Sequence, residues 1–158
     1  MDAQTAAKGS AVREVFLNDL NDLEKKLTGL AEAIPQDKFG WRPGNGVRSV
    51  SEVYMHVALS NYYFVSSLGV KVPSGINENA EKTVTQKAKV IETLKASMQF
   101  VRQAVKNLPE ADLHKATSLE GEQTTYEGAL LVISGHMHEH LGQLIAYARS
   151  NGVVPPWS

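Results

Sequence analysis

The chain has no cysteine among its 158 residues. This absence excludes disulfide bonds, thiolate ligands to a metal and a cysteine nucleophile in catalysis. Excess charge of one sign is also lacking, because 16 Lys and Arg against 17 Asp and Glu leave a formal net charge of −1. Nucleic-acid binding needs a stripe of basic residues that neutralises phosphates, and the sequence has none. We therefore expect no nucleic-acid partner.

Long apolar runs are missing as well. The longest strongly apolar run, residues 129–133, is far shorter than the ~20 residues that a membrane-spanning helix needs, so we expect no membrane partner. Residues 1–10 are small and polar and lack the apolar centre of a signal peptide. Together with the missing cysteines, these features indicate a cytoplasmic protein.

The chain does have 42% hydrophobic residues in a length typical of one domain. A chain of this size buries roughly 68–70% of its unfolded surface, so its core needs no disulfide or metal for support. No internal repeat or low-complexity tract divides the sequence. We interpret residues 1–158 as a single domain.

Four segments place apolar residues three and four positions apart, and no alternating, strand-like run rivals them. They span approximately residues 10–33, 49–68, 83–107 and 124–151. Four amphipathic helices of about 20 residues each predict an all-α fold, a four-helix bundle. The connection before the last helix, about 16 residues long, exceeds the usual loop length and leaves room for a short extended piece within residues 116–123.

Local signals mark where two of these helices begin and where the last one ends. A capping box is a Ser or Thr followed three residues later by Glu, and each side chain satisfies a backbone N–H of the other residue. The sequence has two at helix starts, Ser49–Glu52 and Thr124–Glu127. Asn151-Gly152 is typical of a helix C-terminus.

Two of the five histidines, His136 and His140, lie one turn apart in the last predicted helix and share a face. Four apolar residues fall on that face: Ala129, Val132, Ile133 and Tyr147. Buried imidazoles need partners for their ring nitrogens, and a metal ion would supply one for each. The alternative is a pair of surface or hydrogen-bonded histidines, because two ligands do not make a site. His138 lies about 200° from His136 and should face elsewhere.

The other candidates carry weaker signals. His56 is the only histidine of the second helix and sits off its apolar stripe, so periodicity alone indicates a half-exposed structural residue. His114, in the loop after the third helix, is not expected to bind metal. Glu52, one turn before His56, could orient its ring or serve only as a cap. Gln143, one turn after His140, could line a pocket or form hydrogen bonds across the bundle.

Three stretches carry a resemblance to a known family. Residues 39–43 read FGWRP, residues 47–58 read VRSVSEVYMHVA, and residues 135–152 read GHMHEHLGQLIAYARSNG. In this order they resemble the motifs of the DinB/YfiT-like superfamily of small bacterial four-helix proteins. The second stretch is similar to the family's second-helix motif, which ends on a metal-binding histidine. The third is similar to its fourth-helix motif.

The resemblance implies a metal site formed by His56 of the second helix and by His136 and His140 of the fourth. It also implies one divalent ion, zinc or nickel, for which imidazole is a suitable ligand. Many members have a second histidine just before the last ligand, where this sequence has Glu139. The family bundle runs up-down-down-up, and a crossover over residues 70–82 is compatible with that topology.

The relatives implied by the resemblance include metal-dependent transferases that add thiols such as bacillithiol or mycothiol to electrophiles, a thiol-dependent isomerase and proteins described as hydrolases. We therefore expect a metal-dependent enzyme of the low-molecular-weight thiol S-transferase type, or a hydrolase, with a small-molecule thiol or other small substrate as its partner. The alternatives are a non-catalytic, stress-associated module that binds metal or a small ligand, and histidines with only a structural role.

Three further expectations concern mechanism and assembly. No Gly-x-Ser-x-Gly elbow is present, so acid–base work in catalysis would involve Glu52 or Glu139. Imidazole binds metal only when neutral, so metal affinity should weaken below about pH 6.5. Apolar residues outside the main stripes, such as Leu59 and Leu131, predict a homodimer, which family members commonly form.

Overall fold

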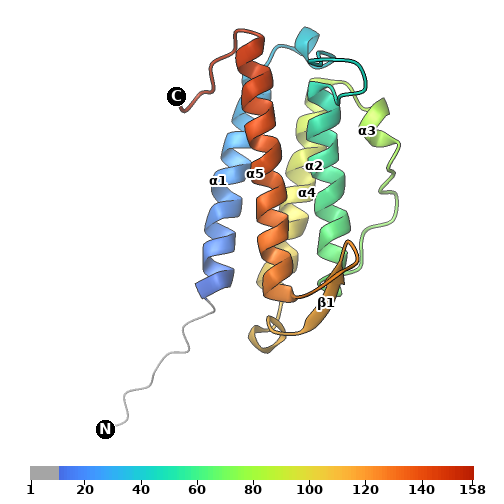
Figure 1. Cartoon of the computed structure of the whole chain (residues 1–158), viewed down its shortest axis with the longest axis vertical. Helices are drawn as coiled ribbons and strands as arrows, with labels where there is room; N and C mark the ends of the chain where they lie inside the picture. Colours follow the sequence, from blue (N-terminus) through green and yellow to red (C-terminus); the bar gives the residue numbers. More distant parts are fainter. Residues whose placement is uncertain (1–10) are drawn as a thin grey trace.

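The computed structural model describes residues 11–158, and within them four long helices form a bundle (Figure 1). They are α1 (Ala11–Ala33), α2 (Val50–Ser66), α4 (Lys87–Asn107) and α5 (Tyr126–Ser150). The smaller elements are a short helix α3 (Ala80–Thr83), single 3₁₀ turns at Gln36–Lys38 and Glu110–Asp112, and an antiparallel hairpin of β1 (Ala116–Leu119) and β2 (Glu122–Thr125). The predicted all-α four-helix class is confirmed.

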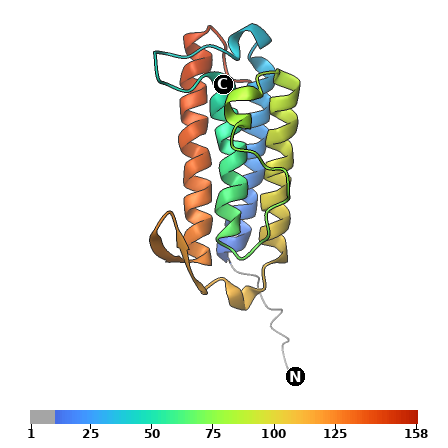
Figure 2. The same cartoon turned by 90° about the vertical axis from the view of Figure 1, so that its right-hand side faces the viewer.

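The helices run up, down, down and up in chain order, as the resemblance implied (Figure 1). Because α2 and α4 point the same way, residues 67–86 must travel back along the whole bundle before α4 can begin (Figure 2). Each long helix packs against two others: α1 and α2 both contact α4 and α5. The α2–α5 contact is the one that matters for the candidate site, because all three predicted metal ligands lie on these two helices.

One predicted capping box is confirmed and the other is wrong. The Ser49 hydroxyl accepts a hydrogen bond from the N–H of Glu52 at 3.3 Å, and the Glu52 carboxylate accepts one from the N–H of Ser49 at 2.7 Å. At α5 the cap is Thr125, whose hydroxyl accepts from the N–H of Gly128. Thr124 cannot cap the helix because it pairs with Thr117 in the hairpin.

The third long helix begins at Lys87 rather than near residue 83, and a tertiary contact explains the difference. The Gln36 side-chain oxygen accepts from the N–H of Lys87 at 2.6 Å, and its amide donates to the Thr85 carbonyl at 3.1 Å. The Lys87 ammonium also donates to the carbonyl of Ile34 at 2.8 Å. These partners come from the α1–α2 connection, so no local pattern could reveal them. The predicted helix start at residue 10 lies outside the described residues.

The extended piece expected within residues 116–123 is the β1–β2 hairpin. Its two-residue turn, Glu120-Gly121, has positive φ at both positions, 52° and 86°. Turns of this kind match the twist of the flanking strands, and glutamate adopts such a conformation less readily than glycine. The hairpin is tied to the end of α2 by a hydrogen bond from the Thr117 hydroxyl to the Ser67 carbonyl at 2.7 Å.

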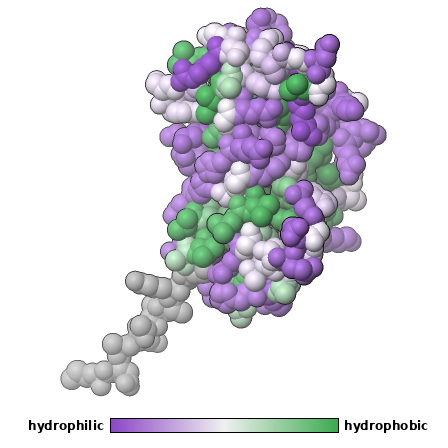
Figure 3. All heavy atoms as spheres, viewed as in Figure 1, coloured by the Kyte–Doolittle hydropathy of each residue, from purple (hydrophilic) through white to green (hydrophobic). Residues whose placement is uncertain are grey.

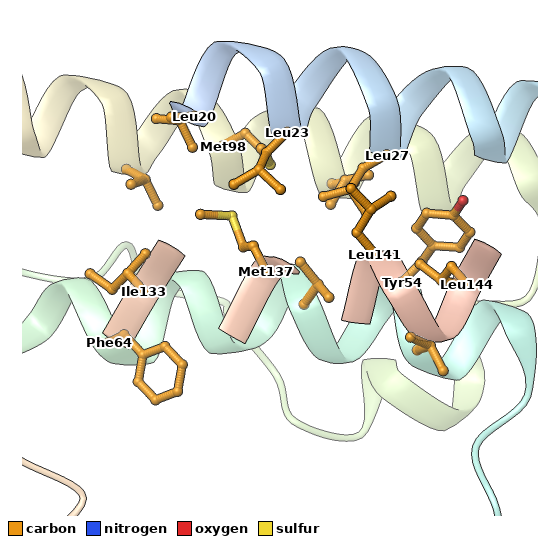
Figure 4. Packing of buried hydrophobic residues seen from close by; sticks show 14 of the residues in the cluster. Leu20, Leu23, Leu27, Tyr54, Phe64, Met98, Ile133, Met137, Leu141 and Leu144 are labelled. Atoms are coloured by element: carbon orange, nitrogen blue, oxygen red, sulfur yellow. The ribbon is translucent and has the colours of Figure 1, made fainter. Parts of the chain in front are cut away.

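The core is formed by the apolar stripes of the four long helices. Figure 4 shows Leu23 and Leu27 of α1 opposite Met137, Leu141 and Leu144 of α5. All five side chains are at most 5% exposed. Full burial of such a side chain stabilises the fold by about 1.5–3 kcal/mol, so this layer holds α5 in a fixed rotation.

An apolar patch remains on the surface formed by α1 and α5, where Val15 is 67% and Leu131 is 70% exposed. Together with Val12 they line a shallow groove, and Figure 3 shows an apolar band on this face. Leu59, also noted in the sequence, is half-buried and faces a different cleft. Among residues 11–158, no helix combines the length and the hydropathy that a membrane crossing requires.

We expect the protein to form a homodimer that covers this patch, because exposed apolar surface favours self-association. Light scattering at micromolar concentration should give twice the chain mass. Leu131→Glu should give the monomer mass, because dimerisation would remove the water that surrounds the new carboxylate, and this desolvation costs free energy. Val154→Glu, at a residue that is 62% exposed on the C-terminal tail, is the matched control and should remain dimeric. A monomer mass for the unmodified protein would contradict the prediction.

Candidate metal centre

The structure brings together the three histidines that the sequence singled out. His56 extends from α2 toward α5, where His136 and His140 lie one turn apart. The Nε2 atoms of His56 and His136 are 3.0 Å apart. One ring nitrogen from each of the three histidines lies within 4.8 Å of the other two. The cluster joins residues 80 positions apart in the sequence, so it depends on how α2 packs against α5.

These nitrogens fit a divalent metal ion. Two facing Nε2 atoms at 3.0 Å can share one proton or can both point a lone pair at a cation. Nitrogens bound to one zinc ion at about 2.0–2.1 Å in tetrahedral geometry lie roughly 3.3 Å apart, so small side-chain shifts would suffice. The Nδ1 atom of His136 is buried without a hydrogen-bond partner, which leaves the facing side as the polar contact of this ring. An all-imidazole set is typical of zinc, nickel, copper and iron.

The ring of His140 is held by a hydrogen-bond chain along α5. Its Nδ1–H donates to the Gln143 side-chain oxygen at 2.8 Å, which leaves Nε2 unprotonated and free for a ligand. The Gln143 amide donates to the Tyr147 hydroxyl at 2.9 Å, and that hydroxyl donates to the Arg48 carbonyl at 3.2 Å. Gln143 therefore orients a candidate metal ligand. Its position in the sequence had left open whether it lines a pocket or forms hydrogen bonds across the bundle.

The ring of His56 is held by Glu81, a residue that the sequence analysis missed. One carboxylate oxygen of Glu81 lies 3.3 Å from His56 Nδ1, and the other accepts from Arg48 Nε at 2.7 Å. Glu52, the carboxylate first considered for this role, instead caps α2 and pairs with Arg42 at 3.0 Å. Glu81 belongs to α3 in the crossover, and only the path of that segment along the bundle brings it to His56.

The two remaining histidines lie outside the cluster, as expected. His138 Nε2 lies 2.8 Å from a carboxylate oxygen of Asp19 on the α1–α5 face. His114 is exposed, with its Nδ1 3.2 Å from a carboxylate oxygen of Glu127. Neither ring takes part in the three-histidine group.

The surroundings keep two of the clustered histidines neutral. Burial lowers the pKa of His136 to about 4, and positive charge on His140, His56 or Arg48 acts in the same direction. Burial also lowers the pKa of His56, with help from Arg48 and His140, while Glu81 acts in the opposite direction. Neutral imidazole is the form that binds metal, so competition from protons begins at lower pH for these two rings than for histidine in water.

Metal-free protein should lose stability as the pH falls from about 6.5 toward 4. In the unfolded chain histidine takes up its proton near the ordinary pKa of 6.5, whereas folded His136 does so only near a pKa of about 4. Between these values the unfolded state binds more protons, so the free energy of unfolding falls as the pH falls. Because the ring is partly exposed, we expect this contribution to be on the order of 1 kcal/mol. Urea denaturation at pH 7 and pH 4.5 should show it, and His136→Gln should reduce the difference. If the free energy of unfolding depends on pH equally in the unmodified protein and in His136→Gln, the attribution of this effect to His136 is refuted.

Glu81→Gln should weaken metal binding by about 10–100-fold, the usual cost of removing a carboxylate that orients a ligand histidine. Glu52→Gln is the matched control on the same helix as His56. It should leave metal affinity nearly unchanged and keep the cap, because the glutamine oxygen can still accept from the Ser49 N–H. Loss of the ion pair with Arg42 should lower the free energy of unfolding by less than about 1 kcal/mol. Competition with a chromogenic chelator gives the affinities. If Glu52→Gln loses the metal and Glu81→Gln keeps it, the structural assignment of the two carboxylates is wrong.

A cleft of about 830 Å³ opens onto the cluster. Its walls come from α2, the crossover, the β1–β2 turn and α5, for example Tyr63, Ile76, Glu120 and Glu139. Clefts of this size hold small molecules. Glu139, where many relatives were expected to have a histidine, lines the cleft. The three-histidine cluster is therefore accessible to a small molecule.

Comparison with known proteins shows the family and the fold of the chain. The chain matches the family model of the DinB superfamily over residues 19–144. A DinB-like protein from Bacillus cereus superposes with a TM-score of 0.80 at 16% identity, covering 90% of this chain and 95% of that one. A DinB-like protein from Bacillus subtilis gives 0.69 at 19% identity, covering 87% and 92%. YfiT from Bacillus subtilis, described as a probable metal-dependent hydrolase with an unusual four-helix bundle topology, gives 0.70 at 17% identity, covering 96% and 95%.

At these identities the solved structures show a shared fold and nothing more. No curated protein matches the chain. The family model, however, covers well over half of the sequence and includes all three clustered histidines. The chain belongs to the DinB superfamily.

Proposed function

We propose that this protein is a metal-dependent enzyme that uses one divalent ion, zinc or nickel, held by His56, His136 and His140. The observation that carries the proposal is the convergence of three imidazoles on a cleft that is open to small molecules. Catalytic metal sites typically have three protein ligands and one open position, whereas structural sites are closed by four. The cluster contains three donors and no fourth among residues 11–158, which agrees with the catalytic pattern.

We propose transfer of a low-molecular-weight thiol to an electrophile as the reaction. A divalent ion in this site would lower the pKa of a bound thiol or water toward neutrality. The thiol must come from outside the chain, because the protein has no cysteine. Glu81 and Gln143 orient the ligand rings. Glu139 lines the cleft, whereas Glu52 is committed to Arg42 and the helix cap, so Glu139 is the carboxylate we assign to proton transfer.

Hydrolysis is the second candidate reaction, with water in the place of the thiol. The description of YfiT as a probable metal-dependent hydrolase favours it. The same residues would serve both reactions, since orientation of the histidines and proton transfer are needed in each. The two reactions differ in the nucleophile, a thiol or water, and in the electrophile that it attacks.

The test is an assay of metal-loaded protein with a chromogenic aryl halide and several thiols, run beside ester and amide substrates. We expect substitution of the halide by the thiolate, with release of the halide ion and the thiol proton, above the uncatalysed rate, and loss of that rate in His56→Ala. Hydrolysis without this substitution would select the second reaction. Failure of both in protein that carries metal would overturn the enzyme proposal in favour of a module that binds metal or a small ligand.

A further inference from the structure

We infer that the cleft accepts small molecules that carry a positively charged amino group and an apolar part, and that it discriminates against anionic ones. The inference rests on the proposed function in one respect, because the bound molecule is taken to reach the three-histidine cluster. It names the class of substrate that this site would select.

The charges around the cleft are unbalanced. Of the charged groups that line it, Arg48 is neutralised by Glu81, its ion-pair partner at 2.7 Å. Glu78, Glu120 and Glu139 also line it, and none of them pairs with a cation within residues 11–158. A divalent ion on three neutral histidines would offset two of these carboxylates, and one negative charge would remain. A cleft lined by charge of one sign concentrates the potential at its opening and raises the local concentration of opposite charge.

The three free carboxylates come from separate parts of the fold. Glu78 lies in the crossover, Glu120 in the β1–β2 turn and Glu139 on α5. All three are exposed, so their charge remains in contact with water at the rim. An incoming cation would thus meet negative charge from three sides without having to lose its own hydration completely.

The inner end of the cleft presents a different chemistry. His140 is only 8% exposed, and its Nδ1 is already occupied by Gln143. One ring nitrogen of His140 lies within 4.8 Å of ring nitrogens of His56 and His136, and this grouping is independent of the acidic residues. Tyr63 and Ile76 also line the cleft and are 58% and 39% exposed. These surfaces suit the apolar part of a ligand, and the tyrosine ring also attracts cations.

The cleft therefore favours a molecule with a metal-binding group at one end, an apolar middle part and an ammonium group at the other end. A thiol that carries an amine fits this description. A thiol that carries carboxylates would place like charge against the rim, which costs binding energy at low ionic strength.

The test compares two thiols of similar length on cobalt(II)-loaded protein. Cysteamine carries an ammonium group and 3-mercaptopropionate carries a carboxylate. The thiolate-to-cobalt absorption band gives the Kd of each, and the ratio of the two Kd values is the measured preference. The intrinsic preference of the ion cancels when this ratio is compared between the unmodified protein and a variant.

We expect the triple variant Glu78→Gln, Glu120→Gln and Glu139→Gln to reduce the preference for cysteamine about tenfold in low salt. Raising the salt to about 0.5 M should reduce it in the unmodified protein as well. The matched control is Glu122→Gln, which removes the same charge from β2 outside the cleft and should leave the ratio unchanged. Glu139→Gln alone should give part of the effect, which keeps the test open if the triple variant folds poorly.

The outcomes separate the inference from the proposed function. A variant that binds cobalt normally but keeps the full preference overturns the inference and leaves the metal-dependent function standing. A larger Kd for cysteamine than for 3-mercaptopropionate that does not change with salt also overturns it. Unmodified protein that binds no cobalt overturns the proposed function, and the inference with it.

Discussion

His56→Ala, His136→Ala and His140→Ala should each remove most of the metal from purified, untagged protein, while the unmodified chain carries close to one ion. Each histidine supplies one of the three nitrogens that lie within 4.8 Å of one another, so each substitution leaves only two donors. The loss of affinity should exceed the roughly 10–100-fold that is typical of a residue that only orients a ligand. Elemental analysis after dialysis against a weak chelator measures the remaining metal.

His138→Ala is the matched control for this experiment, because it removes the same ring from the same helix. The His138 ring contacts Asp19 rather than the cluster, so the variant should keep its metal. Circular dichroism should show that all four variants remain helical, since the core layer of α1 and α5 does not involve these rings. Full metal content in His56→Ala would refute the three-ligand site even if the other variants behave as expected.

Much of the fold could be predicted from the sequence because its signals are local. The four apolar stripes, the Ser49–Glu52 cap and the Asn151-Gly152 stop all act within a few residues of where they stand. The errors occurred where distant residues decide the outcome. Gln36 from another connection sets the start of α4, and hairpin pairing of Thr124 moves the cap of α5 to the next residue.

The candidate site was partly predictable for the same reason. His136 and His140 follow from their spacing on a buried face, and the structure refines that face. Val132 is 41% exposed, His136 is partly buried and His140 is 8% exposed. Each residue of this series is rotated about 40° around the helix from the one before it. Burial therefore increases steadily from the exposed edge of this face toward the core. The cluster therefore sits at the rim of the core, where a cleft can reach it.

His56 and Glu81 mark the limit of what periodicity can show. His56 lies off the apolar stripe of α2 because it faces the rim of the α2–α5 contact, and only the family resemblance nominated it. Glu81 has no signal in the sequence at all. Its role depends on a crossover that runs the length of the bundle and brings a short helix against His56 (Figure 2).

Chelation should abolish thiol transfer or hydrolysis, and added zinc or nickel should restore it. Without the ion, three neutral imidazoles provide no charge that could lower the pKa of a thiol or water, and the chain offers no cysteine as a substitute. Glu139→Gln should retain the metal and lower kcat by about a hundredfold, as expected for loss of a proton-transfer group. Activity and metal content should be measured on the same samples.

The surface trio of Ser134, Asp19 and His138 provides the sharpest control for this mechanism. Its residue types match a serine-hydrolase triad, but its order does not: Asp19 accepts from the Ser134 hydroxyl at 2.5 Å and lies 2.8 Å from His138 Nε2. A triad needs the histidine between the other two, so that it can take the proton of the serine. Ser134→Ala should therefore leave activity unchanged. Loss of activity in Ser134→Ala, or activity that survives complete metal removal, would refute the metal-dependent mechanism.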